Sequence, residues 1–162
     1  MRVTMIGAGY VGLVSGACFA DFGHHVTCVD KEAGRIAALK RGEIPIFEPG
    51  LADLVATNMA QKRLSFSIKP DGIDEADAVF IAVGTPSRRG DGHADLSYIY
   101  SAVREIAPLL SPTAVVVTKS TVPVGTGSRV AGILRRARPQ ASFDVASNPE
   151  SVSYTHLRAP RD

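Results

Sequence analysis

The chain has 162 residues, of which 45% are hydrophobic and 21% charged, and its 18 Lys and Arg against 16 Asp and Glu leave a net charge of +2. A chain of this length buries roughly two thirds of its unfolded surface, so one globular domain can fold without disulfides or structural metal. The near balance of charge argues against a nucleic-acid partner. Apolar runs such as residues 114–117 fall far short of the roughly 20 residues that span a bilayer, so we expect no membrane partner either.

The cysteines and the N-terminus bear on the cellular compartment. Cys18 and Cys28 form no CxxC pair and have no histidine cluster nearby, which excludes a zinc site and a disulfide scaffold. The apolar stretch after Arg2 is interrupted by Gly7 and Gly9, so it lacks the unbroken apolar segment of a secretory signal. We therefore expect a cytoplasmic protein with two free thiols and no metal.

Short β-branched runs alternate with stretches of helical periodicity along the chain. The short runs predict strands at residues 3–6, 26–30, 64–68, 78–83, 114–118 and 143–146. The periodic stretches predict helices at residues 11–22, 32–41, 51–59, 96–110 and 127–137, with Asp95 as a candidate N-cap of the fourth. Because parallel strands need long helical crossovers, the alternation predicts an α/β fold, a doubly wound parallel sheet with helices on both faces.

Residues 7–12, GAGYVG, form a GxGxxG motif between the first predicted strand and the first predicted helix. In this position each glycine has its own task. Gly7 permits the tight turn, Gly9 lets the backbone approach a pyrophosphate, and Gly12 lets the helix pack close to the strand. The helix N-terminus offers N–H groups to the phosphates. The motif predicts a Rossmann-type dinucleotide site, and a glycine-rich turn without a ligand is the alternative.

Asp30 ends the second predicted strand, 18 residues beyond Gly12. At that distance from the motif a carboxylate accepts both ribose hydroxyls of NAD, and it repels a 2′-phosphate, which favours NAD over NADP. A helix N-cap is the alternative role for Asp30. Arg88 and Arg89, in a later loop, are candidates for a phosphate contact, with a solvated loop as the alternative.

Polar residues also follow three later strands. Residues 84–86 (GTP), 120–126 (STVPVGT) and 148–150 (NPE) come directly after predicted strands, whose carboxyl ends share one edge of a parallel sheet. Structural turns are the alternative for the first two segments. At this edge Glu150 would lie near a nicotinamide ring, where an acid-base role competes with that of a solvated side chain.

Five segments, in this order, resemble the nucleotide-sugar dehydrogenase family, and the resemblance covers residues 1–150. The segments are MIGAGYVGLVSGACFADFGH, CVDKEAGRIAALKRGEIPIFEPGL, VFIAVGTPSRRGDGHADLSY, VVVTKSTVPVGT and SNPE. A generic Rossmann protein shares the first glycines but not the later segments in that order. The stretch GEIPIFEPGL is more similar to family members that act on UDP-glucose than to those that act on UDP-N-acetylmannosamine or GDP-mannose.

The resemblance implies an NAD-dependent oxidoreductase that converts the C6 alcohol of UDP-glucose to the carboxylate of UDP-glucuronate. The family uses two hydride transfers to two NAD, one water, and a cysteine that forms a thiohemiacetal and then a thioester. Asp30 would hold the adenosine ribose and Arg35 would be a basic cofactor contact. The implied cofactor-binding residues are Gly7, Gly9, Tyr10, Val11, Gly12, Asp30, Arg35, Thr85 and Thr121.

The resemblance also implies a catalytic group. Thr121 and Glu150 would position and deprotonate the water that hydrolyses the thioester. Asn148, Pro149 and Glu150 would contact the substrate. The whole enzyme is expected to be a homodimer, joined through a long helix.

Several family features do not occur in this sequence. The Gly-rich nucleophilic cysteine motif, the catalytic lysine, the sugar domain and the dimerising helix have no counterpart, and Cys18 and Cys28 are expected to be core residues. We therefore expect residues 1–150 to be an incomplete NAD-binding domain that is inactive alone. A non-catalytic NAD-sensing module and a dehydrogenase for another nucleotide sugar are the alternatives.

The sequence departs from the family pattern after Glu150. Tyr154 stands where the family has a second glutamate, and SVSYTHLRAPRD resembles translated sequencing-adapter DNA. We expect residues 151–162 to be a non-native tail, with a natural divergent tail as the alternative, and exclude them from fold predictions.

Overall fold

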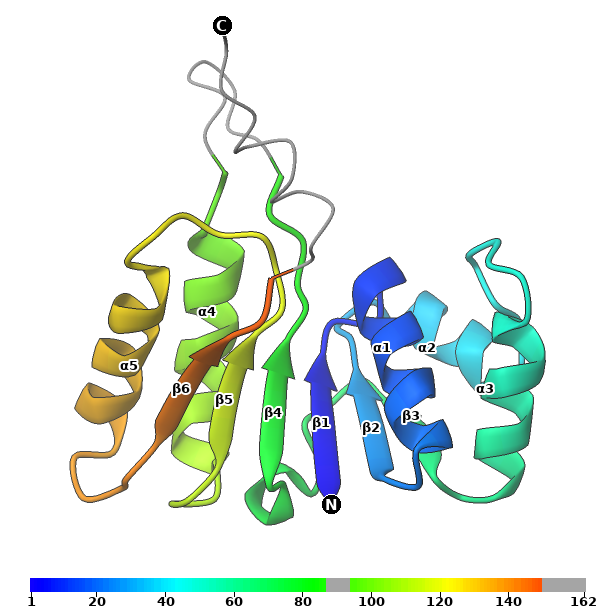
Figure 1. The fold of residues 1–162 in the computed structure, drawn as a ribbon, viewed down its shortest axis with the longest axis horizontal. Coiled ribbons are helices and arrows are strands. Elements are labelled where there is room, and N and C mark those ends of the chain that lie inside the picture. Colours follow the sequence, from blue (N-terminus) through cyan, green and yellow to red (C-terminus); the bar gives the residue numbers. More distant parts are fainter. Residues whose placement is uncertain (87–93, 150–162) are drawn as a thin grey trace, which may run out of the picture.

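The computed structural model describes residues 1–86 and 94–149 (Figure 1). Arg88, Arg89, Glu150 and the expected tail at residues 151–162 therefore lie outside the described residues.

Six strands of the described residues form one parallel sheet in the order β3-β2-β1-β4-β5-β6. They are β1 (Arg2–Ile6), β2 (His25–Val29), β3 (Leu64–Ser67), β4 (Ala78–Ile81), β5 (Val115–Thr118) and β6 (Asp144–Ser147). All of the strand pairings are parallel, so the carboxyl ends of the strands share one edge of the sheet, the edge to which the arrowheads of β1, β4, β5 and β6 point in Figure 1. The chain runs outward from β1 in one direction as far as β3, and β4 then starts the other half on the opposite side of β1. This order creates a switch point between β1 and β4, outside which ligands bind in open α/β sheets.

The helices of the described residues connect the strands. They are α1 (Tyr10–Asp21), α2 (Ala33–Lys40), α3 (Leu51–Ala60), α4 (Ser97–Ile106) and α5 (Thr126–Ala137), with short 3₁₀ turns η1 (Ile73–Glu75) and η2 (Ala107–Leu109). Every predicted strand and helix is confirmed, with small shifts at the ends. The helix predicted to reach residue 110 ends earlier and continues as η2, because Pro108 has no N–H for the α-helical ladder.

The start of α4 differs slightly from the prediction. Leu96, not Asp95, occupies the N-cap position. Asp95 still helps to cap the helix, because its Oδ1 accepts a hydrogen bond of 2.9 Å from the Ser97 N–H.

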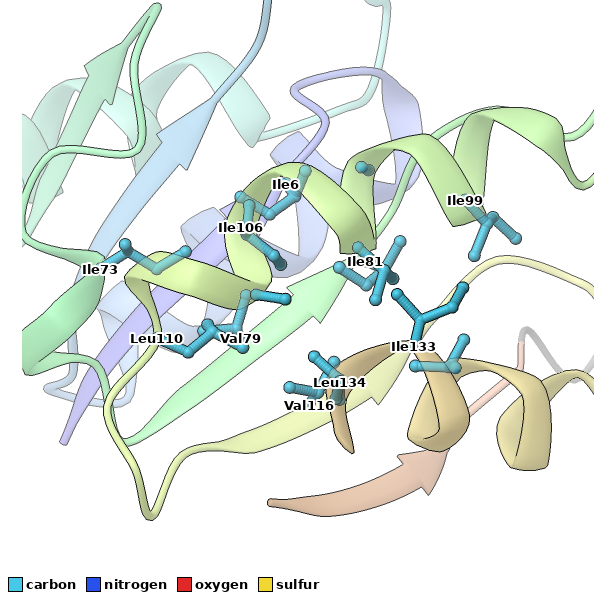
Figure 2. Packing of buried hydrophobic residues seen from close by; sticks show 14 of the residues in the cluster. Ile6, Ile73, Val79, Ile81, Ile99, Ile106, Leu110, Val116, Ile133 and Leu134 are labelled. Carbon is cyan, nitrogen blue, oxygen red and sulfur yellow. The ribbon is translucent and has the colours of Figure 1, made fainter. Parts of the chain in front are cut away.

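Two hydrophobic cores lie on opposite faces of the sheet, as the doubly wound prediction requires. Side chains alternate along a strand, so Val3 and Met5 of β1 belong to the core under α1, α2 and α3, whereas Ile6 belongs to the other. The second core packs α4 and α5 against the sheet, and Figure 2 shows its side chains interleaving: Val79, Ile81, Ile99, Ile106, Val116, Ile133 and Leu134. Both faces are covered, which confirms the α/β fold class.

The two cysteines differ in burial. Cys28 is fully buried in β2, as expected, and burial raises the pKa of its thiol to about 12. Cys18 of α1 is only partly buried, so the expectation that both are core residues is wrong for Cys18. The buried residues of α1 include Leu13 and Ala17 but not Cys18.

The described residues contain neither a candidate membrane-spanning helix nor a candidate metal site. None of the helices in residues 1–86 and 94–149 has the length and apolar character that crossing a bilayer requires. The same residues contain no group of three or more His, Cys, Asp or Glu side chains placed to hold a metal ion.

Candidate dinucleotide-binding site

The turn between β1 and α1 requires glycine at two positions of the GxGxxG motif. Gly7 has φ +105°, and a Cβ there would lie 2.6 Å from the carbonyl oxygen of Ala82. A Cβ on Gly12 would lie 1.8 Å from the carbonyl oxygen of Gly7. Gly7 therefore permits the tight turn, as predicted. Gly12 permits α1 to pack closely against the end of β1 at Gly7, which is also the predicted role.

Gly9 differs from the other two glycines. Its φ of −73° suits any residue, and a Cβ there would meet no atom within 4 Å. Nothing in the fold of the described residues therefore requires glycine at this position. The empty space beside Gly9 opens into a cavity, next to the N-terminal end of α1 where a helix attracts phosphate. A glycine here leaves no side chain between the backbone and a ligand that approaches it.

Asp30 connects the glycine turn to the start of α2. Its Oδ2 accepts hydrogen bonds from the Ala8 N–H (2.9 Å) and the Arg35 guanidinium (2.7 Å), and its Oδ1 accepts one from the Glu32 N–H (3.0 Å). Burial raises the pKa of the Asp30 carboxyl, but the two backbone hydrogen bonds and Arg35 outweigh it, and the net pKa lies below the ordinary value. The side chain is therefore a carboxylate at neutral pH. The N-cap of α2 is Glu32, so Asp30 is not the cap residue.

Arg35 is held by two carboxylates. Besides Asp30, it contacts Glu32, with 2.6 Å between Arg35 Nη2 and Glu32 Oε2. The Arg35 side chain remains one-third exposed and lines the cavity. The predicted basic contact is thus at the site, but its charge is already paired.

The cavity lies at the carboxyl ends of β1, β2 and β4 and is covered by α4. Its volume of about 620 Å³ is within the range of small-molecule sites. Its apolar floor includes Ile6, Val29 and Ile106, and its polar wall includes Asp30 and Arg35. The cavity thus combines an apolar floor with a carboxylate at its wall. The polar side chains of α4 that line the cavity, Tyr98, Ser101 and Glu105, do not follow from the sequence, because the helix pattern alone gives no sign of them.

Tyr10 and Val11 form the first turn of α1 beside this cavity without lining it. The Tyr10 hydroxyl donates a hydrogen bond of 2.8 Å to Glu48 Oε2, and Val11 packs partly buried against the core below. Glu48 belongs to the loop between α2 and α3, so this contact fastens the loop to the glycine turn. The sequence motif EPGL contains Glu48, but its partner was not predicted.

The remaining predicted residues lie further along the same edge of the sheet, where β4, β5 and β6 end. The Thr85 hydroxyl donates to the Thr121 carbonyl oxygen (3.4 Å), and the Asn148 N–H donates to the Thr118 carbonyl oxygen (2.9 Å). Lys119 Nζ donates to Asn148 Oδ1 at 3.1 Å. Thr85, Thr121 and Asn148 are therefore brought to one edge, as predicted, and Pro149 follows directly.

Two further side chains at this edge were not singled out from the sequence. The Ser120 hydroxyl is buried and donates to the Val83 carbonyl oxygen at 2.6 Å, which joins the ends of β4 and β5. Thr118 Oγ1 is buried with no hydrogen-bond partner among the described residues. Both lie in or beside KSTVPVGT, so the motif carried a signal for the region but not for these contacts.

Comparison with known proteins identifies related sequences. Residues 1–156 match the model of the UDP-glucose/GDP-mannose dehydrogenase family, NAD binding domain. Over 151 residues the chain is 66% identical to a UDP-glucose 6-dehydrogenase of Rhizobium meliloti, a match that covers 93% of this chain and 35% of the relative. A UDP-glucose 6-dehydrogenase of Bacillus subtilis is 50% identical over 92% of this chain and 32% of its own length. The chain thus spans about a third of the length of these relatives.

Solved structures share the fold. A UDP-glucose dehydrogenase from Pyrobaculum islandicum superposes with a TM-score of 0.85 at 38% identity, over 92% of this chain and 35% of that one. A GDP-mannose dehydrogenase from Pseudomonas aeruginosa, solved as a ternary complex, gives a TM-score of 0.84 at 34% identity, over 93% and 36%.

Proposed function

Because the chain belongs to the UDP-glucose/GDP-mannose dehydrogenase family and carries its NAD-binding domain, we propose that it supplies the cofactor site of a UDP-glucose 6-dehydrogenase. The proposed parent reaction oxidises UDP-glucose to UDP-glucuronate with two NAD and one water. The observation that carries the proposal is the glycine turn joined to the Asp30 carboxylate at the rim of the 620 Å³ cavity. The 66% identity to a UDP-glucose enzyme supports UDP-glucose as the sugar nucleotide, and among the solved structures the UDP-glucose enzyme is 38% identical and the GDP-mannose enzyme 34%.

Each part of the proposed site has a task in holding the cofactor. When bound, NAD accepts the hydride that leaves the substrate. Asp30 is ionised and accepts hydrogen bonds from the adenosine ribose, while Gly9 and the N-terminus of α1 face the pyrophosphate. Arg35 keeps the Asp30 carboxylate in place by its contact with Oδ2.

We further propose that Thr121 and Glu150 act on the hydrolytic water and that Asn148, Pro149 and Glu150 face the substrate. The positions of Thr121 and Asn148 on one sheet edge support this assignment, and Glu150 itself lies outside the described residues. Cys28 cannot be the nucleophile, because it is fully buried and its pKa of about 12 leaves it protonated. Because the sequence also has no counterpart of the family's Gly-rich cysteine motif, we propose that the 162-residue chain binds NAD without turnover.

The proposal extends to the domain limits and the whole enzyme. We assign the NAD-binding unit to residues 1–150 and keep residues 151–162 apart from it. The free thiols of Cys18 and Cys28 suit a reducing cytoplasm. UDP-glucose as partner and a homodimeric whole enzyme rest on the family resemblance.

Calorimetry and an activity assay test the two halves of the proposal separately. NAD added to the 162-residue chain should release binding heat that Asp30→Ala abolishes, and an unchanged titration in that variant, or no heat from either protein, would refute the binding site. Adding UDP-glucose should produce no NADH absorbance, and NADH formation would refute the lack of turnover. Genomic sequence that continues past codon 150 into a Gly-rich cysteine motif supports the enzyme, whereas a stop codon after residue 162 supports a sensing module.

A further inference from the structure

Two cations line the cavity among the described residues, and each is paired with a glutamate. Lys31, directly after Asp30, contacts Glu105 of α4 with 2.5 Å between Nζ and Oε2. Arg35 contacts Glu32 at 2.6 Å in addition to Asp30. The cavity wall therefore contains three carboxylates against two cations, and neither cation is unpaired.

This pairing matters for the choice of cofactor. NADP differs from NAD by a 2′-phosphate on the adenosine ribose, next to the hydroxyl that Asp30 would bind. Proteins that accept this phosphate place an Arg or Lys near it, because a cation must compensate the dianion. Lys31 follows Asp30 in the chain and Arg35 contacts it, so both cations line the cavity close to this carboxylate, but their charges are already compensated.

We propose that Glu32 and Glu105 are specificity-determining residues, which hold Arg35 and Lys31 away from a 2′-phosphate. Selection against NADP then depends on these two glutamates as well as on the carboxylate of Asp30. The inference rests on the proposed function, since it assumes that the adenosine half of the cofactor occupies this cavity.

The exposure of the pairs sets the size of the expected effect. The side chains of Lys31 and Glu105 are 73% and 46% exposed, so solvent screens this pair and its removal should change the affinity ratio only modestly. Glu105→Gln leaves Lys31 without its ionic partner and so free to contact a phosphate. When Glu32 is neutral, Arg35 keeps its contact with Asp30 through Nη1. Its Nη2, which contacts Glu32 in the parent chain, then becomes available to a phosphate.

The test measures dissociation constants of NAD and NADP for the full 162-residue chain by calorimetry at low salt. In the double variant Glu32→Gln with Glu105→Gln, NADP should bind more tightly relative to NAD, so the ratio of the NADP to the NAD dissociation constant should fall about tenfold. This fall should be smaller at high salt, which screens charges. Glu43→Gln is the matched control, because Glu43 pairs with exposed Arg41 outside the cavity and its loss should leave the ratio unchanged.

The ratio measured in each variant decides the inference. A fall in the ratio confined to the double variant supports it. An unchanged ratio in a double variant whose parent binds NAD overturns it, and so does an equal fall in Glu43→Gln. Glu105→Gln alone, which leaves the start of α2 intact, is the second variant should the double variant unfold, and an unchanged ratio there also overturns the inference. A parent chain that binds no NAD refutes the proposed function itself, which is a different outcome.

Discussion

Replacing each of two glycines by alanine separates the demands of folding from those of cofactor binding. In Gly12→Ala the new methyl group would sit 1.8 Å from the carbonyl oxygen of Gly7, whereas real Cβ contacts stay beyond 3.0 Å. The atom it meets belongs to the backbone of a turn that is itself fixed, because Gly7 lies against Ala82. The start of α1 or the turn must therefore shift by more than an ångström. Overpacking of this kind costs typically 1 to 3 kcal/mol, so we expect a loss of about 3 kcal/mol in the free energy of unfolding.

Gly9→Ala is the matched substitution, since its methyl group meets no atom within 4 Å. We expect its unfolding free energy to stay within about 1 kcal/mol of the parent, because the only cost is an alanine at a helix N-cap. Its NAD affinity should fall, because the methyl occupies the space open to the pyrophosphate. Urea unfolding followed by circular dichroism measures the first effect and calorimetry the second. Equal unfolding free energies for the two variants would refute the packing argument, and unchanged NAD affinity in Gly9→Ala would refute the placement of the pyrophosphate.

The remaining predictions concern protonation, thiol reactivity and a buried hydroxyl. The pKa of Asp30 is lowered in the folded chain, so its contribution to stability is present above its unfolded pKa of about 4 and is lost as the pH falls through the folded pKa. Urea unfolding between pH 2 and about 6 should show a shallower acid loss for Asp30→Asn than for the parent, and equal slopes would contradict this. Iodoacetamide at about pH 8 should label Cys18 but not Cys28 in the folded chain, because the Cys28 thiol is buried with a pKa of about 12, and it should label both cysteines in urea. Mass spectrometry that finds Cys28 labelled in the folded chain would count against its burial. Thr118→Val should raise the unfolding free energy by about 1 kcal/mol, since it removes a buried hydroxyl with no partner among the described residues, and a loss of stability would mean that the hydroxyl is bonded.

The sequence predicted the strands and helices well because their patterns are local. Val3–Ile6 reads as a buried strand from neighbouring residues alone, and the packing of Gly12 follows from the motif spacing. The end of α4 was placed too late because the periodicity continues to residue 110, although Pro108 interrupts the backbone ladder. The partial exposure of Cys18 depends on which face of α1 the other elements cover, and helical spacing alone placed it inside.

The contacts that shape the site were harder to predict because they join distant parts of the chain. Tyr10 and Glu48 meet only after the loop between α2 and α3 folds back over the glycine turn. Lys31 and Glu105 belong to different halves of the sheet, and their separation depends on how α4 covers the cavity. The position of Asp30 at the site was predicted from its spacing to Gly12, but its hydrogen bond with Ala8 was not.

The hydrogen bond between the Ala8 N–H and Asp30 has a consequence for how related sequences are interpreted. The same carboxylate that would receive a ribose also fixes the glycine turn and the first residues of α2 in the chain without ligand. An aspartate at this position therefore serves the folded protein whether or not a dinucleotide ever binds. A descendant of this domain that had lost its cofactor would still be under pressure to keep Asp30. Retention of Asp30 is thus poor evidence that a related domain still binds a dinucleotide. Gly9 is the better marker of a functional cofactor site, because the described fold does not require glycine there.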